Sequence, residues 1–182
     1  MIDTVRPLAR SLGETITEGV LAVLCAVATL VMLLAVEPDE WGLVGFLPGA
    51  CVSFGSLLLL ERRLPRRGAF TPQAGAPGDA RRETPAATVR RIIFGRDAWF
   101  IAILPLTYLT TLPDIPALLP GAVVGAVAGA GLYGLRDAIR LARWERAHGR
   151  ILLHETLEVP LSVKPLWQRA VYSEPRGEAV NP

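Results

Sequence analysis

The sequence predicts an all-α integral membrane protein with four transmembrane helices arranged as two hairpins. Hydrophobic residues make up 51% of the 182 residues and charged residues only 20%. The uncharged residues are gathered into long runs, and every Lys and Arg lies in alternate segments between these runs. Runs of this length are typical of helices that cross a bilayer. A water-soluble globular domain is therefore disfavoured.

The first predicted hairpin covers residues 19–60. Residues 19–36 carry no charge and would form a helix about 27 Å long, close to the ~30 Å hydrocarbon core. Glu37 and Pro38 follow where a signal peptide would carry its small-residue cleavage site, so an uncleaved span is favoured. Residues 41–60 form the second span, with Trp41 as an interfacial anchor. Before the hairpin, residues 1–18 are expected to be an amphipathic segment in which a helix begins at Pro7.

The second predicted hairpin covers residues 98–135. Residues 98–112 provide only fifteen uncharged residues and include Pro105. This helix must therefore start earlier, near Ile92, or the bilayer must thin around it. Residues 115–135 form a longer run, and the helix is expected to begin at about Pro120 because proline is favoured in a first turn.

The basic residues predict the orientation. Segments 1–18, 61–97 and 136–182 contain 2, 9 and 8 of the 19 Lys and Arg residues, so the other two connections contain none. The positive-inside rule then places both termini in the cytoplasm. The preference for Arg over Lys, together with abundant Ala, Gly and Pro, is typical of a high-GC bacterial genome. We therefore expect a multi-pass protein of the bacterial inner membrane.

The cytoplasmic loop at residues 61–97 is expected to be flexible. Between residues 65 and 87 the chain contains four prolines and few large apolar side chains, so no helix is expected there. Residues 89–96 combine Ile92, Ile93 and Phe94 with arginines, which suits a short segment lying in the headgroup region.

The cytoplasmic tail at residues 136–182 is expected to begin as a continuation of the last helix. Gly149 can end that helix, because glycine adopts the left-handed conformation of a C-terminal cap. Residues 151–163 alternate with the period of a strand. No partner strand is identified in the chain, which leaves strand addition to another protein, extended packing against the helices, or chance alternation.

A short motif suggests an internal repeat. Leu47-Pro48-Gly49-Ala50 recurs 72 residues later as Leu119-Pro120-Gly121-Ala122. Each copy follows a Pro-Asp pair and precedes an arginine-bearing exit. We interpret the hairpins either as a parallel duplicated repeat or as chance similarity in an apolar chain.

Two strips of small residues are the candidate helix-packing sites. Small residues every four positions let helix backbones approach closely in lipid, where burial of apolar surface gives little driving force. The contact could form within one chain or between chains. The strips consist of Gly45, Gly49, Ser53, Gly121, Gly125 and Gly129.

Arginines near the membrane boundary are the candidate contacts for anionic phospholipid or an acidic partner. The alternative is that they only determine topology, as in any inner-membrane protein. They are too closely tied to the membrane boundaries to favour nucleic acid as a partner. The set consists of Arg62, Arg63, Arg66, Arg67, Arg136, Arg140, Arg143 and Arg146.

The sequence contains no enzyme signature, and we expect no catalytic, cofactor or metal site. Cys25 and Cys51 lie in apolar runs, where thiols behave as small hydrophobes. His148 and His154 lack the spacing of a helical metal pair. A Ser, a His and an acidic residue could be combined into a triad, but no G-x-S-x-G motif supports one.

These features favour a non-enzymatic accessory or scaffold subunit of a membrane complex. Its partners would be the lipid bilayer and either another membrane protein or a second copy. The alternative is a small oligomeric pore of the holin type, in which the glycine strips join protomers. A membrane enzyme is the least favoured class.

Overall fold

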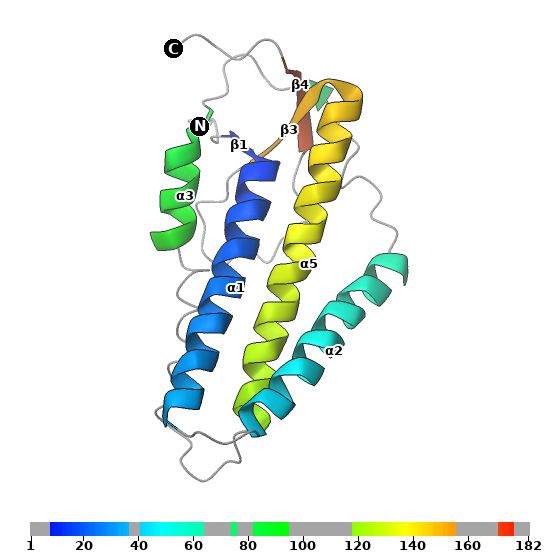
Figure 1. Ribbon diagram of the computed structural model, residues 1–182. Helices are drawn as coiled ribbons and strands as arrows, with labels where there is room; N and C mark the ends of the chain where they lie inside the picture. The colour runs from blue at the N-terminus through cyan, green and yellow to red at the C-terminus, as the bar shows by residue number, and fades with distance from the viewer. Residues whose placement is uncertain are drawn as a thin grey trace, which may run out of the picture.

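The computed structural model describes residues 8–36, 41–63, 74–75, 82–94, 118–155 and 171–176. These residues are mostly helical, with a small sheet at one end of the helices (Figure 1). The helices are α1 (Ser11–Val36), α2 (Trp41–Arg63), α3 (Pro85–Phe94) and α5 (Leu118–His148). The strands are β1 (Leu8–Arg10), β2 (Ala74–Gly75), β3 (Arg150–Glu155) and β4 (Val171–Pro175).

Three of the helices are long and apolar enough to cross a membrane. The candidate spans are Ser11–Ala35, Leu43–Glu61 and Leu119–His148. They contain most of each of the predicted spans at 19–36, 41–60 and 115–135. The predicted span at 98–112 lies outside the described residues.

Helix α5 lies between α1 and α2 (Figure 1). It runs parallel to α2, because Gly49 lies beside Ala122 while Glu61 lies beside Arg136. It runs antiparallel to α1, whose Gly19 lies beside Leu135 near the other end of the contact. A small core of Ala26, Val124 and Ala128 fills the centre of the bundle. Helix α5 is therefore the element on which the other two long helices pack.

The sheet lies where α1 begins and α5 ends (Figure 1). Its strand order is β1-β3-β4-β2, with β3 antiparallel to both β1 and β4, and β2 parallel to β4. The expectation of an all-α protein is therefore wrong at this end. Strands of two or three residues are too short to show an alternating pattern, and pairing between distant segments leaves no local signal.

Strand β3 corrects the interpretation of the tail. Residues 151–155 do form a strand, and residues 156–163 lie outside the described residues. The expectation that the strand has no partner in this chain is wrong, because Leu8 pairs with Glu155 and Leu153 with Tyr172. Gly149, with φ at +60°, precedes the strand and confirms the predicted helix cap.

Two further segments differ from expectation. Residues Leu8–Arg10 form β1, so the first helix begins at Ser11 rather than Pro7. Strand β2 and the start of α3 both fall between residues 65 and 87, where no helix was expected. Helix α3 begins at Pro85 because proline suits a first helical position and Thr84 Oγ1 accepts a hydrogen bond from the Ala87 amide, at 3.2 Å. The Thr-Pro pair was the sequence signal for this start.

Candidate functional site at the arginine-rich end of the bundle

The predicted glycine strips face each other inside one chain. A Cβ atom at Gly49 would overlap the Ala122 backbone, and one at Gly125 would overlap the carbonyl of Phe46. A Cβ atom at Gly129 would likewise overlap the carbonyl of Ala50. The two copies of the Leu-Pro-Gly-Ala motif therefore lie on contacting faces of α2 and α5. Of the other strip residues, Gly45 and Gly121 are buried and Ser53 is half-buried.

Helix α5 uses a second set of small residues against α1. A Cβ atom at Gly131 would lie 3.0 Å from the carbonyl oxygen of Gly19 and 3.0 Å from the Ala22 Cβ. Gly19 and Gly131 were not among the predicted packing residues. Their signal was weaker, since Gly131 and Gly134 are three rather than four residues apart.

Toward its last turns, α2 leans away from α5 (Figure 1). Large side chains replace the glycines here, and the rings of Phe54 and Tyr133 meet edge to face with centroids 6.3 Å apart. A Cβ atom at Gly55 would meet nothing within 4 Å. The contact of α2 and α5 at Gly49, Gly125 and Gly129 is called the glycine crossing. The arginine-rich end is the sheet together with the helix turns next to it. The two helices therefore diverge from the glycine crossing toward the arginine-rich end.

A single carboxylate joins α2 to α5 at this end. Arg136 Nη1 donates to Glu61 Oε2 at 2.8 Å, and Arg140 pairs with Glu61 Oε1. The Tyr133 hydroxyl donates to the same carboxylate at 3.3 Å. Asp137 lies 3.9 Å from Arg136 and 3.7 Å from Arg140. Two of the predicted contact arginines are therefore already held within the chain.

Glu145 joins α5 to the sheet. Arg10 Nη2 in β1 donates to Glu145 Oε2 at 2.6 Å, and the Leu152 amide in β3 donates to Oε1 at 3.2 Å. The Glu145 side chain is 2% exposed. A carboxylate buried this deeply is stable as an anion only with such partners.

Glu14, in the first turn of α1, is the centre of a third cluster. It is 5% exposed and lies 3.4 Å from Arg91 of α3. Arg91 Nε also donates to Glu83 at 3.1 Å, and Thr88 donates to Glu83 at 3.1 Å. Burial disfavours the charged form of Arg91, but Glu14 and Glu83 outweigh that cost, so the pKa of Arg91 is raised above its ordinary value. The cluster therefore fixes α3 against α1.

His154 completes this cluster from the sheet. Its Nε2 pairs with Glu14 Oε2, and its Nδ1 shares a hydrogen bond of 2.9 Å with the Ser11 hydroxyl. Serine, histidine and carboxylate thus meet in the order found in hydrolase triads. Ser11 lacks the strained backbone of a nucleophile elbow, since none of the described residues other than glycine has a positive φ. The arrangement joins the start of α1 to β3.

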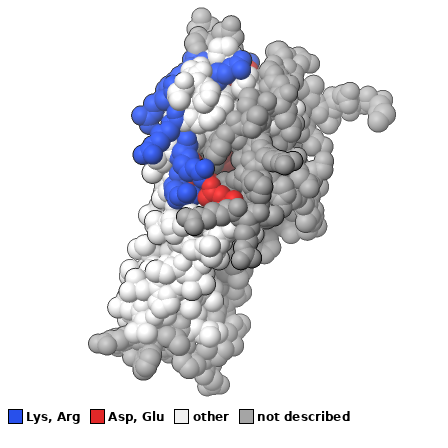
Figure 2. Space-filling view, turned by 90° about the vertical axis from the view of Figure 1, so that its right-hand side faces the viewer, with Lys and Arg blue, Asp and Glu red and all other residues white. Residues whose placement is uncertain are grey.

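The remaining predicted arginines differ from these paired ones. Arg143 and Arg146 are exposed on the last turns of α5. Arg62 and Arg63 end helix α2, and Arg66 and Arg67 lie outside the described residues. Figure 2 shows basic side chains gathered toward one end of the molecule, with acidic side chains at their lower edge and an uncharged described surface below them. This end is the candidate functional site.

In the described ranges, His148, unlike His154, makes contacts only within its own helix. The His148 ring stacks on Trp144 with centroids 4.3 Å apart, and its Nδ1 lies 2.9 Å from the Trp144 carbonyl oxygen. Among the described residues, no group of three or more His, Cys, Asp and Glu side chains could hold a metal ion.

No protein-family model, curated protein or solved structure matches the chain.

Proposed function

We propose that the chain is a non-enzymatic accessory or scaffold subunit of a membrane complex in the bacterial inner membrane. The supporting observation is that the described elements satisfy one another within the chain. The glycine strips of α2 and α5 face each other, and Glu61 joins the same two helices. Two buried carboxylates, Glu14 and Glu145, tie the helices to α3 and the sheet. A self-contained bundle of this kind presents rigid outer faces to a partner.

Two surfaces are available for such a partner. The side of α2 turned away from α5 is apolar and exposed, with Val52 70% exposed and Leu47 65% exposed. In a bilayer this side faces lipid or another membrane helix. At the arginine-rich end, Arg143 and Arg146 are exposed to anionic headgroups or acidic protein segments.

A photo-crosslinking amino acid at Val52 tests this role in cells that produce the full chain. The matched control is the same amino acid at Val124, which is 5% exposed inside the bundle. We expect position 52, and not position 124, to crosslink to one defined membrane protein identified by mass spectrometry. Crosslinks from position 52 to lipid alone would contradict the proposal.

A holin-type pore is the alternative function. It would need close helix contacts between protomers, and the strips best suited to such contacts are engaged within the monomer. Reconstituted protein should therefore leave dye-loaded vesicles intact. Dye release together with homo-oligomeric crosslinks from position 52 would favour the pore.

The topology that both functions assume can be tested with single cysteines. In a chain whose Cys25 and Cys51 are replaced by alanine, a cysteine at Asp39 or Asp114 should react with an impermeant maleimide in intact cells. A cysteine at Gly75 or Ser173 should react only after lysis. Labelling at Gly75 in sealed cells would reverse the proposed orientation.

A further inference from the structure

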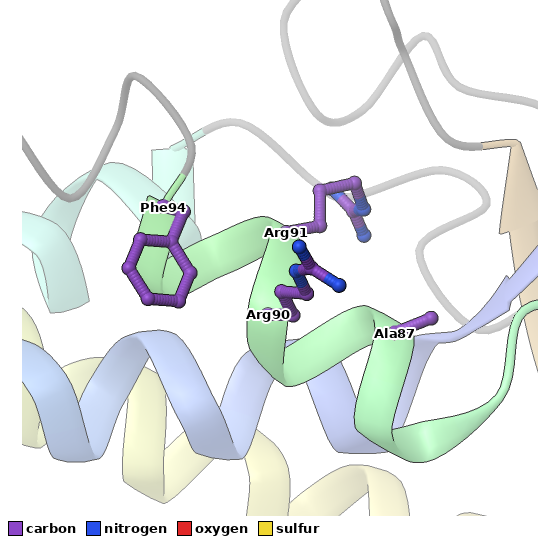
Figure 3. Close-up of a pocket in the computed structure, with 4 residues that line it drawn as sticks. All are labelled: Ala87, Arg90, Arg91 and Phe94. Atoms are coloured by element: carbon purple, nitrogen blue, oxygen red, sulfur yellow. The ribbon is translucent and has the colours of Figure 1, made fainter.

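Helix α3 has an exposed face of which only the Arg91 side chain takes part in the contacts described above. Its buried residues Thr88 and Ile92 pack toward the bundle, and Arg91 is held by Glu14 and Glu83. On another face, at spacings of three and four residues, a shallow pocket of about 400 Å³ is lined by Ala87, Arg90, Arg91 and Phe94 (Figure 3).

The charge of this pocket comes from Arg90. The charge of Arg91 is matched by two carboxylates, whereas Arg90 is exposed and makes no ion pair within the described part of the chain. An exposed guanidinium with free N–H groups suits a phosphate, which can accept two parallel hydrogen bonds from it.

The apolar side of the pocket comes from Phe94. Its side chain is 75% exposed, and the neighbouring Ile93 is 44% exposed. Aromatic and aliphatic side chains exposed to this degree at the end of a helix suit the boundary between headgroups and acyl chains. The pocket therefore combines a cationic part and an apolar part four residues apart.

The depth of α3 places these two parts in a definite order. Helix α3 runs beside the first turns of α1 and in the same direction (Figures 1 and 3). The contact between Arg91 and Glu14 sets its middle level with the first turn of that membrane-spanning helix. Phe94 then lies about 6 Å further along the axis than Arg90, toward the uncharged part of α1. The helix thus runs alongside α1, and its predicted place in the headgroup region stays a prediction.

We propose that this face of α3 binds one anionic phospholipid, with Arg90 on the phosphate and Phe94 beside the start of the acyl chains. The order of the two residues along the membrane normal matches the order of phosphate and acyl chain in a leaflet. The unmatched positive charge of Arg90 complements a headgroup with one net negative charge. This inference rests on the proposed membrane location, and it adds a lipid site that lies apart from the arginines of α2 and α5.

Native mass spectrometry of the full chain in detergent tests the site. Delipidated protein is mixed with phosphatidylglycerol or, in a parallel series, with phosphatidylcholine. We expect retention of phosphatidylglycerol to fall about tenfold in Arg90→Gln, as for the loss of one charge-assisted hydrogen bond. In Phe94→Ala it should fall about fivefold through lost apolar contact. Both side chains are exposed, so both variants should keep the unfolding temperature of the parent chain in detergent.

The matched control is Arg150→Gln, which removes an exposed arginine at the start of β3 that is not among the candidate lipid contacts. It should leave retention within about twofold of the parent chain, the scatter expected of a surface charge. An equal loss in both arginine variants would show diffuse charge attraction and overturn the site. Equal retention of phosphatidylcholine would overturn the choice of an anionic lipid.

Inorganic phosphate distinguishes a lipid from a free anion. Millimolar phosphate should neither raise the unfolding temperature nor displace phosphatidylglycerol. Protection by phosphate that requires Arg90, without lipid retention, would assign the pocket to a soluble anion and overturn the proposal. Loss of partner crosslinks from position 52 with lipid retention intact would instead disprove the scaffold role and leave this site standing.

Discussion

The glycine crossing and the arginine-rich end hold the same two helices together by opposite means. Along one face of α5 the residues at successive turns are Gly121, Gly125, Gly129, Tyr133 and then the arginine pair 136 and 140. At Gly125 and Gly129 α2 approaches until backbone meets backbone. At the last positions α2 leans away, and Glu61 and two arginines fill the space.

The difference follows from the surroundings of each contact. In the apolar part of a span there is little hydrophobic force between helices, so attraction depends on close atomic contact. At the end, where water and headgroups are near, charged groups can be solvated while they pair. Added side-chain atoms at the glycine crossing should therefore destabilise the fold. At the arginine-rich end, the loss of one member of a buried ion pair should destabilise it.

The largest effect should follow from Arg10→Met. This change leaves Glu145, which is 2% exposed, without its cation. Breaking a buried pair costs about 3–5 kcal/mol, and we expect about 3 kcal/mol because Arg10 itself is 45% exposed. Unfolding of the purified protein in mixed micelles measures the loss. Adding Glu145→Gln keeps an acceptor for the Leu152 amide and should restore most of it; no recovery in the double variant would contradict the buried-pair explanation.

Gly125→Leu should have the next largest effect. The new side chain would meet the Phe46 carbonyl and force α2 away, at a cost of about 2 kcal/mol. Gly55→Leu on α2 is the control, because a Cβ there meets nothing within 4 Å. The same unfolding measurement should show the loss only in the first variant and at every protein concentration. A loss that appears only where an oligomer forms would show that the strips pack between chains.

Ser11→Ala should destabilise the fold by about 1 kcal/mol, the contribution of one hydrogen bond. The hydroxyl contacts His154 Nδ1, and its removal loosens the start of α1 from β3. Thermal unfolding in detergent is the measurement, and Thr17→Ser, which keeps its bond to the Gly13 carbonyl, is the control. Covalent labelling of Ser11 by a fluorophosphonate probe would show a reactive nucleophile and contradict a purely structural role.

Glu61→Gln should have the smallest effect, about 0.5 kcal/mol. Its partners Arg136 and Arg140 are 39% and 41% exposed, so solvent replaces much of the lost interaction. Screening should reduce the effect further at high salt. Unfolding at low and high ionic strength measures this dependence, and an effect that grows with salt would contradict it.

The spans and the crossing were predictable because their signals are local. Uncharged runs predicted the three long helices. The four-residue spacing of small residues predicted the contacting faces of α2 and α5, which carry Gly49 and Gly125. The predicted fourth span lies outside the described residues. Whether the two halves arose by duplication stays a hypothesis.

The arginine-rich end was harder to predict because its contacts join distant residues. Arg10 and Glu145 are 135 positions apart, and Ser11 and His154 are 143 apart. The sequence shows a charge at each position but not its partner. Exposed arginines and buried pairs therefore looked alike, and Arg136 and Arg140 were grouped with Arg143 although Glu61 holds only the first two.

The pairing of β1 with β3 also has a consequence for biosynthesis. Strand β1 leaves the ribosome before the first span, and its partner β3 follows the last helix. At about 5–20 residues per second, the ribosome needs on the order of ten seconds to make the intervening chain. Until then Glu14 lacks His154, and Glu145 lacks the amide of Leu152. A chain truncated before Arg150 would keep the candidate spans but leave both carboxylates without these partners, which gives a cell's quality-control proteases a way to distinguish unfinished copies from finished ones.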